Sequence, residues 1–155
     1  MHSAAGLMHD DFRLSNLDYG HLMDCAFKLE RHVKAYEKIL RMAAFNVFAH
    51  NRDDHSKNFA FLMNEKGQWK LSPAYDLTFS SSSHGYHSTM VAGESKDPGK
   101  KHLLELGNYF KIKKAGQIIA QVQDVVSNWN YYAKEAFVEK QSRDLINKKI
   151  SEIAR

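Results

Sequence analysis

Apolar positions in the first third of the chain follow a helical period. Between Leu17 and about Tyr36 they recur every three or four residues, which predicts an amphipathic helix, either continuous or broken around Arg31–His32. Residues 39–49 are apolar on nearly every side, and a helix without a polar face is normally buried in the centre of a domain. We therefore expect this second helix to hold the polar residues after it on a rigid support. Residues 1–16 show no clear period and are predicted to form a leading loop.

Two short aromatic-rich runs follow, separated by a polar connection that contains Gly67. This pattern predicts a β-hairpin over residues 59–71. Pro73 is expected to end the second strand, because proline lacks the backbone donor that a sheet ladder needs. Residues 78–102 have little period and are predicted to form a long loop, a kind of segment that is often functional in a compact domain.

The last third of the sequence returns to a helical pattern. A short helix is expected to begin near Leu103 and to stop at Gly107. Apolar residues between Ile118 and Ala133 mark one long amphipathic face, and residues 145–153 indicate a last helix. The whole chain, residues 1–155, is thus predicted to be a single, mainly α domain with a small β-hairpin.

The composition is that of an ordinary globular protein, with 43% of the 155 residues hydrophobic and 26% charged. Cys25 is the only cysteine, which excludes an intramolecular disulfide and favours a reducing compartment. Residues 1–20 lack the pattern of a signal peptide, and no apolar run approaches the length of a membrane span. We therefore expect a soluble, cytoplasmic protein with no membrane partner.

The net charge of +4 gives weak support to a phosphate-handling partner. The basic residues are scattered apart from two short clusters, one of them Lys96, Lys100 and Lys101, so no basic stripe is present and direct nucleic-acid binding is not expected.

The polar run after residue 49 has a spacing that suits phosphoryl transfer. That reaction needs a carboxylate to accept the proton of the attacking hydroxyl, and oxygen ligands to hold magnesium against the phosphates. In protein kinases the base and a metal-binding asparagine are separated as D-x-x-x-x-N, and a further aspartate follows a short hairpin. Asp53 and Asn58 have this spacing, and the predicted hairpin separates Asn58 from Asp76. We expect the three side chains to converge on one cleft.

At these residues the sequence resembles a known family. The string Asp53-x-His55-x-Lys57-Asn58, followed by Phe59-Ala60-Phe61 and then by Leu71-x-Pro73-x-Tyr75-Asp76-Leu77, is similar to the C-terminal lobe of HipA-like serine/threonine kinases. These are toxins of bacterial toxin–antitoxin modules linked to persistence. The resemblance covers roughly residues 1–125 and includes weaker matches at residues 7–9 and 87–90. It implies a protein-kinase-like C-lobe fold.

The resemblance also implies roles for individual residues. Asp53 would be the catalytic base, and Asn58 and Asp76 would be the magnesium ligands. His55 and Lys57 would lie beside the phosphates of ATP, and Tyr75 would lie near the nucleotide. Asp54 is a competing carboxylate, but only Asp53 keeps the spacing to Asn58. The implied cofactors are Mg²⁺ and ATP, and the implied partners are a protein substrate and an antitoxin-like DNA-binding protein.

Several parts of a kinase are not recognisable in this sequence. Its glycines never form G-x-G-x-x-G, and nothing resembles the V-A-I-K strand lysine. We therefore expect an N-lobe to be absent from this chain, with two explanations left open. The chain is either a C-lobe that meets an N-lobe on another chain, or a truncated remnant. In both cases the isolated chain is expected to bind ATP weakly and to be inactive.

Two other functions remain as alternatives. One is a metal-dependent phosphohydrolase, with a site drawn from His50, Asp53, Asp54, His55, His84 and His87. The other is a non-catalytic module that binds a partner through Trp129, Tyr131 and Tyr132, although a tryptophan at helical spacing is more often core.

The loop after Asp76 corresponds, by the resemblance, to a kinase activation loop. Its β-favouring stretch, residues 87–91, is predicted to be anchored against the lobe, whereas residues 80–85 are predicted to be mobile. Lys96, Lys100 and Lys101 are expected to attract an acidic partner or substrate.

Overall fold

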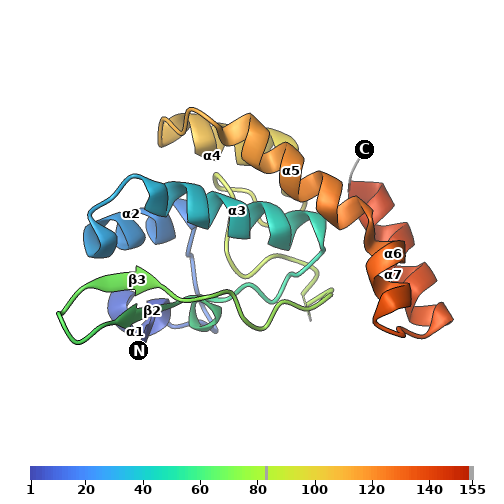
Figure 1. Cartoon of the computed structure of the whole chain (residues 1–155), viewed down its shortest axis with the longest axis horizontal. Coiled ribbons are helices and arrows are strands. Elements are labelled where there is room, and N and C mark those ends of the chain that lie inside the picture. The colour runs from blue at the N-terminus through green and yellow to red at the C-terminus, as the bar shows by residue number, and fades with distance from the viewer. Residues whose placement is uncertain (83, 154–155) are drawn as a thin grey trace.

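The computed structural model describes residues 1–82 and 84–153. Its central element is helix α3, Lys34–Phe48, which packs against α2, Tyr19–Glu30, and against α5, Ala115–Ser127. Figure 1 shows α3 between a small sheet on one side and helices α4 and α5 on the other. The buried side chains of α3 are those of Ala35, Ile39, Leu40, Ala43, Ala44, Asn46, Val47 and Phe48. The prediction of a buried central helix over residues 39–49 is confirmed, and the helix begins earlier.

The break predicted around Arg31–His32 is also confirmed. Arg31 ends α2 in the left-handed region at φ 53°, and its backbone N–H donates to Phe27 O. At the other end Asp18 caps the helix, because its side chain accepts from the backbone N–H of Gly20 while its own N–H donates to His21 Nδ1. This cap places the first helical residue at Tyr19 rather than at Leu17.

The sheet has three antiparallel strands in the order β1-β2-β3. The predicted hairpin is present as β2, Ala60–Met63, and β3, Trp69–Leu71. The third strand, β1, His2–Ser3, pairs with β2 and leads into α1, Ala4–Met8. The prediction of a leading loop over residues 1–16 is therefore wrong for its first half. This segment is too short to show a period, and it takes its form from pairing with β2 and from the Ser3 hydroxyl, which caps α1.

The C-terminal third differs from its prediction in where its helices begin and end. Helix α4, Lys100–Tyr109, continues through Gly107 instead of stopping there. A Cβ at Gly107 would lie 2.5 Å from the Cβ of Ala115, so the absence of a side chain at this position allows α4 and α5 to pack closely. The face predicted over 118–133 is divided between α5 and α6, Trp129–Glu135, because Asn128 ends the first helix and its side chain donates to Asp124 O.

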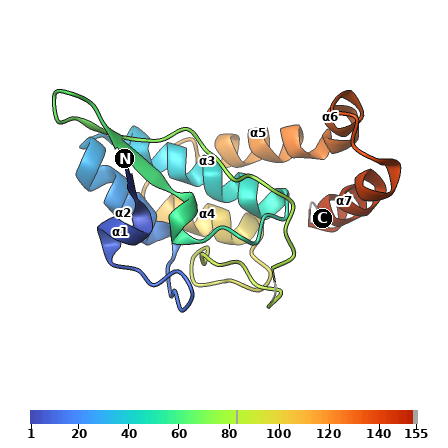
Figure 2. The ribbon, with the colours of Figure 1, turned by 90° about the horizontal axis from the view of Figure 1, so that it is seen from below.

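The last helix, α7, Lys140–Ile153, begins five residues before the predicted Leu145. Figure 2 shows α6 and α7 together at the far end of α5, away from the sheet. Of the helices in the described part of the chain, none combines the length and the apolar character that crossing a bilayer requires.

Candidate active site

The polar loop begins where α3 ends. The chain turns at His50, which adopts a positive φ of 54°, and the backbone N–H of Asn51 donates to Asn46 O at 2.9 Å. The side-chain amide of Asn51 also donates to Asn46 Oδ1 at 3.1 Å. The buried end of α3 therefore holds the start of the loop through both backbone and side chain, as the sequence predicts.

The D-x-x-x-x-N segment closes on itself. Asn58 ends a short 3₁₀ turn over Ser56–Asn58, and its Nδ2 donates to the backbone carbonyl of Asp53 at 2.9 Å. The Asp53 side chain is 54% exposed, and its Oδ1 lies 3.7 Å from His55 Nε2. The five-residue spacing thus corresponds to a closed loop, in which the Asn58 side chain returns to the backbone of Asp53, the predicted base.

Phe12 organises two of the predicted phosphate-side residues. The Lys57 ammonium lies 3.7 Å from the centroid of the Phe12 ring, and the His55 ring lies 5.4 Å from it. A cation over an aromatic face is held by the ring quadrupole. Phe12 was not identified in the sequence, because a single aromatic residue in an aperiodic segment shows no pattern. The position of His55 and Lys57 relative to a nucleotide remains a prediction.

The segment that carries Asp76 runs beside this loop. The Ser72 N–H donates to Ala60 O at 2.8 Å, and the Tyr75 hydroxyl donates to Lys57 O at 2.5 Å. Further on, the Ser80 N–H donates to His50 O at 3.0 Å. Asp76 lies between the last two of these tethers.

The backbone at Asp76 is unusual and its side chain is exposed. It adopts a positive φ of 53°, a conformation that is uncommon for residues other than glycine. Burial raises the pKa of Tyr75, and the neighbouring Asp76 carboxylate adds to this shift. The backbone contacts place Asp76 beside the 50–58 loop, whereas a metal site shared with Asn58 stays a prediction.

Asp54 has a different environment from its neighbour. Its side chain is fully buried, and three donors and one histidine nitrogen surround the carboxylate. Oδ1 accepts from the backbone N–H groups of Ser88 at 2.8 Å and Thr89 at 3.2 Å. Oδ2 accepts from the Tyr19 hydroxyl at 2.8 Å and lies 3.0 Å from His87 Nδ1. Asp54 therefore anchors residues 87–89, which belong to the loop that follows Asp76. The spacing of the motif alone did not reveal this role.

The residues considered for a phosphohydrolase site meet in pairs, Asp53 with His55 and Asp54 with His87, and form no larger metal-binding group in the described part of the chain. Among residues 1–82 and 84–153, no group of three or more His, Cys, Asp and Glu side chains is placed to share a metal ion. The Asp54 carboxylate is already engaged by protein donors, and the His50 ring packs against Phe79 with centroids 5.3 Å apart. Burial lowers the pKa of His50 to about 4, with the charges of Arg52 and Lys149 adding to this effect.

The predicted anchoring of residues 87–91 is confirmed. His87, Thr89 and Val91 are buried, and Met90 is hydrogen-bonded through its backbone to Leu17 and Tyr19. The mobility predicted for residues 80–85 stays a prediction, and Ser83 lies outside the described residues. Arg52 adds a second anchor, because its guanidinium donates to the carbonyls of Gly85 and Lys96.

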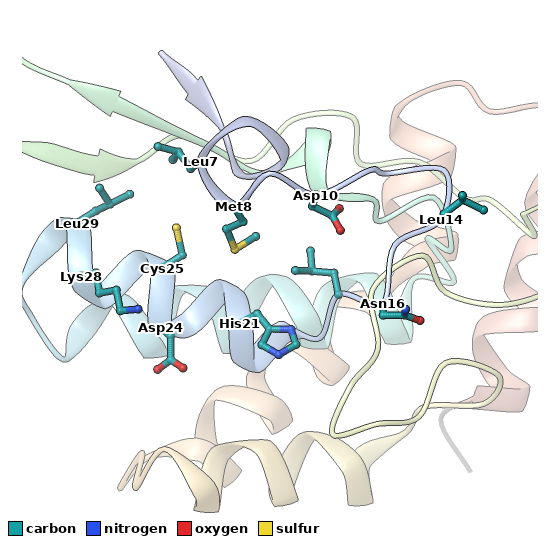
Figure 3. Close-up of a pocket in the computed structure, with 11 residues that line it drawn as sticks. Leu7, Met8, Asp10, Leu14, Asn16, His21, Asp24, Cys25, Lys28 and Leu29 are labelled. Carbon is teal, nitrogen blue, oxygen red and sulfur yellow. The ribbon is translucent and has the colours of Figure 1, made fainter.

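A polar pocket of about 510 Å³ opens beside Asp53. Phe12, Arg13 and Ser15 line one part of it, and residues of the later loop, among them Tyr86 and Ser88, line another. A separate hollow of about 730 Å³ lies between α1, the 10–17 segment and α2 (Figure 3). It contains Cys25, whose thiol has a pKa raised by burial, and it shares no lining residue with the pocket at Asp53.

The fold and the loop together define a helical lobe that presents a D-x-x-x-x-N segment and a following aspartate beside a small antiparallel sheet. The sequence model of the HipA-like C-terminal domain matches residues 1–129. The chain belongs to this family, so the resemblance that the motifs indicated is confirmed.

The structure is also similar to that of the HipA protein of Shewanella oneidensis MR-1, solved as a toxin–antitoxin complex of HipA, HipB and operator DNA. The TM-score is 0.69 at 16% sequence identity, over 92% of this chain and 36% of that chain. This chain thus shares a fold with about a third of that protein. No curated protein matched the chain in sequence.

Proposed function

We propose that this lobe supplies the catalytic base and the magnesium ligands of an ATP-dependent serine/threonine protein kinase of the toxin–antitoxin type. The observation that carries the proposal is the closure of the 53–58 loop by the Asn58 amide, together with the Tyr75–Lys57 tether beside it. These contacts tie the segment that carries Asp53 and Asn58 to the segment that carries Asp76. Membership of the HipA-like C-terminal domain family adds independent support.

The donor set suits magnesium. Because Asn58 Nδ2 is engaged by the Asp53 carbonyl, Asn58 Oδ1 is left as the ligand atom, and the exposed Asp76 carboxylate supplies a second hard oxygen. Bound between these residues and the phosphates, the ion would neutralise charge that develops during transfer. The exposed Asp53 carboxylate accepts the proton of an acceptor hydroxyl that enters the adjacent polar pocket.

The glycine-rich loop and the strand lysine that hold the phosphates of ATP in kinases are not recognisable in this sequence. The proposal therefore requires them from a further segment of a longer polypeptide or from a second chain. Residues 1–155 alone are expected to bind ATP weakly. By likeness to the HipA–HipB–DNA complex, an antitoxin-like DNA-binding protein is a proposed partner.

The metal assignment can be tested on the 155-residue chain without any second lobe. Mn²⁺ occupies magnesium sites and broadens the NMR signals of nearby nuclei. We expect substoichiometric Mn²⁺ to broaden the amide signals of residues 53–58 and 75–77 selectively. Asn58→Ala and Asp76→Asn should each abolish this selective broadening. Asp24→Asn, an exposed carboxylate on α2, is the matched control and should leave it unchanged. Broadening spread evenly over exposed acidic residues would refute the magnesium site.

A partner-binding function without catalysis is the second candidate. Tyr131 and Tyr132 are 63% and 50% exposed on α6, whereas the Trp129 Nε1 donates to Arg143 O within the helical end. Of the three aromatic residues considered for this surface, the two tyrosines are thus the exposed ones. If the antitoxin-like protein binds through this surface, Tyr131→Ser with Tyr132→Ser should weaken binding whether or not ATP is present. Unchanged affinity in that double variant would exclude this surface.

A further inference from the structure

A buried polar network joins four separate parts of the lobe. It starts on α3, where Asn46 Nδ2 donates to the Tyr19 hydroxyl of α2 at 2.8 Å. The Tyr19 hydroxyl in turn donates to Asp54 Oδ2, next to the predicted catalytic base. From Asp54 the network continues to His87, Ser88 and Thr89. Burial raises the pKa of Tyr19 well above its ordinary value, so the hydroxyl stays protonated and can donate.

The buried side chains of this network hold residues 87–89 in a fixed position. Tyr19, Asn46, Asp54, His87 and Thr89 are all at most 6% exposed. Thr89 is held twice, because its N–H donates to Asp54 Oδ1 and its hydroxyl donates to Asp54 O at 2.5 Å. A buried carboxylate without its donors is strongly unfavourable, so the network and the segment position are mutually dependent.

The anchored segment also forms part of the pocket that opens at Asp53. Tyr86, His87 and Ser88 line that pocket together with Phe12 and Arg13. The Ser88 hydroxyl donates to Arg52 O at 3.2 Å, directly before the predicted base. Residues 86–88 therefore form a wall of the pocket, and this wall is bonded to Arg52 and Asp54, the two sequence neighbours of Asp53. The metal-side residues Asn58 and Asp76 do not line this pocket.

We propose that Asp54 is a positioning residue for the protein acceptor. Its buried carboxylate fixes the 86–88 wall at the edge of the pocket beside Asp53, and this wall holds the hydroxyl-bearing segment of the acceptor against the base. The Tyr86 side chain, which is 46% exposed, supplies contact surface for that segment. This inference rests on the proposed kinase function. It assigns Asp54 to the acceptor side of the reaction and leaves the metal and the nucleotide to other residues.

Mild variants of Thr89 test this role without removing the buried charge. Thr89→Val is nearly isosteric and removes the hydroxyl that donates to Asp54 O, whereas Thr89→Ser restores a hydroxyl. In the 155-residue chain, we expect Thr89→Val to speed amide hydrogen exchange at Ser88 about tenfold, and Thr89→Ser to return it toward the wild-type rate. The Mn²⁺ broadening at residues 53–58 and 75–77 should stay unchanged in both.

The kinetic test uses the lobe complemented with its N-lobe segment. Thr89→Val should raise KM for the protein acceptor about tenfold and leave KM for ATP unchanged, and Thr89→Ser should rescue the acceptor KM. Tyr19→Phe, which removes another donor to Asp54, should act in the same direction. Tyr36→Phe is the control, because Tyr36 packs between Phe27 and Phe110 outside the network.

Two outcomes separate this inference from the proposed function. An unchanged acceptor KM in Thr89→Val, despite faster exchange at Ser88, would overturn the acceptor role of Asp54. Equal increases in the KM for acceptor and for ATP would also overturn it, since they would indicate a general loss of site structure. If the wild-type lobe shows no selective Mn²⁺ broadening and no phosphotransfer when complemented, the proposed kinase function fails. The acceptor role then falls with it, whatever the exchange rates show.

Discussion

Two adjacent carboxylates have opposite environments in this lobe. Asp53 is half exposed beside a polar pocket, and its Oδ1 lies 3.7 Å from His55 Nε2. Asp54 is buried and accepts hydrogen bonds from residues more than 30 positions away on both sides in the sequence. The difference shows that one loop can place an accessible carboxylate next to a buried carboxylate that holds distant segments together. The two residues are consecutive in the sequence, yet the Asp53 side chain is 54% exposed and the Asp54 side chain is fully buried.

The largest expected effect comes from removing the buried carboxylate. Asp54→Ala leaves the Tyr19 hydroxyl, His87 and two backbone N–H groups without their acceptor. We expect the free energy of unfolding to fall by about 3–5 kcal/mol. Asp53→Ala should change it by no more than about 0.5 kcal/mol. Urea denaturation of both variants measures the contrast, and equal losses would remove the distinction between the two residues.

A core substitution far from both carboxylates sharpens the comparison. Gly107→Ala places a Cβ 2.5 Å from the Ala115 Cβ, and we expect α4 and α5 to move apart at a cost of about 1–3 kcal/mol. Gly116→Ala is the matched control, because its nearest neighbour would lie 4.0 Å away and alanine favours the helix. Thermal unfolding should show a lower Tm for the first and a slightly higher Tm for the second. The Mn²⁺ broadening at the 53–58 loop should be the same in both variants.

A smaller effect concerns His50, which lies at the start of the loop. Its pKa is about 4 in the folded lobe, below the ordinary value of 6.5 expected in the unfolded chain. The unfolded chain therefore binds the proton first, so stability is lost as the pH falls from about 6.5 to about 4. We expect this loss to be roughly 1–2 kcal/mol.

His50→Asn provides the reference for this measurement. Asparagine does not titrate in this range and tolerates the positive φ that His50 adopts. The free energy of unfolding of the variant should depend less steeply on pH between 6.5 and 4 than that of the wild-type chain. Parallel curves for the two proteins would show that His50 does not titrate on unfolding.

The sequence predicted those parts of the fold that local pattern determines. The central helix, the break near Arg31, the hairpin and the anchored residues 87–91 are all present. The first strand was missed because it depends on pairing with β2, about 60 residues away. Gly107 was interpreted as a helix end because its packing partner on α5 is not visible in a local pattern.

The candidate site shows the same division. Spacing within one segment was enough to select Asp53 and Asn58, and the contact between them lies within that segment. The role of Asp54 could not be predicted, because its donors come from α2 and from a loop more than 30 residues later. The Phe12 contact with Lys57 was missed for the same reason. Long-range contacts, rather than motifs, decide which of two similar residues is buried.

The central claim is that Asp53 is the catalytic base of a kinase lobe, and one measurement tests it most directly. Phosphotransfer to a serine/threonine acceptor is measured with the lobe complemented by the N-lobe segment that the proposed function requires, for the wild type and for Asp53→Asn. We predict that the variant loses at least about 100-fold in kcat, while its fold and its Mn²⁺ broadening remain those of the wild type. An Asp53→Asn variant that keeps its kcat within about threefold of the wild type would contradict the claim.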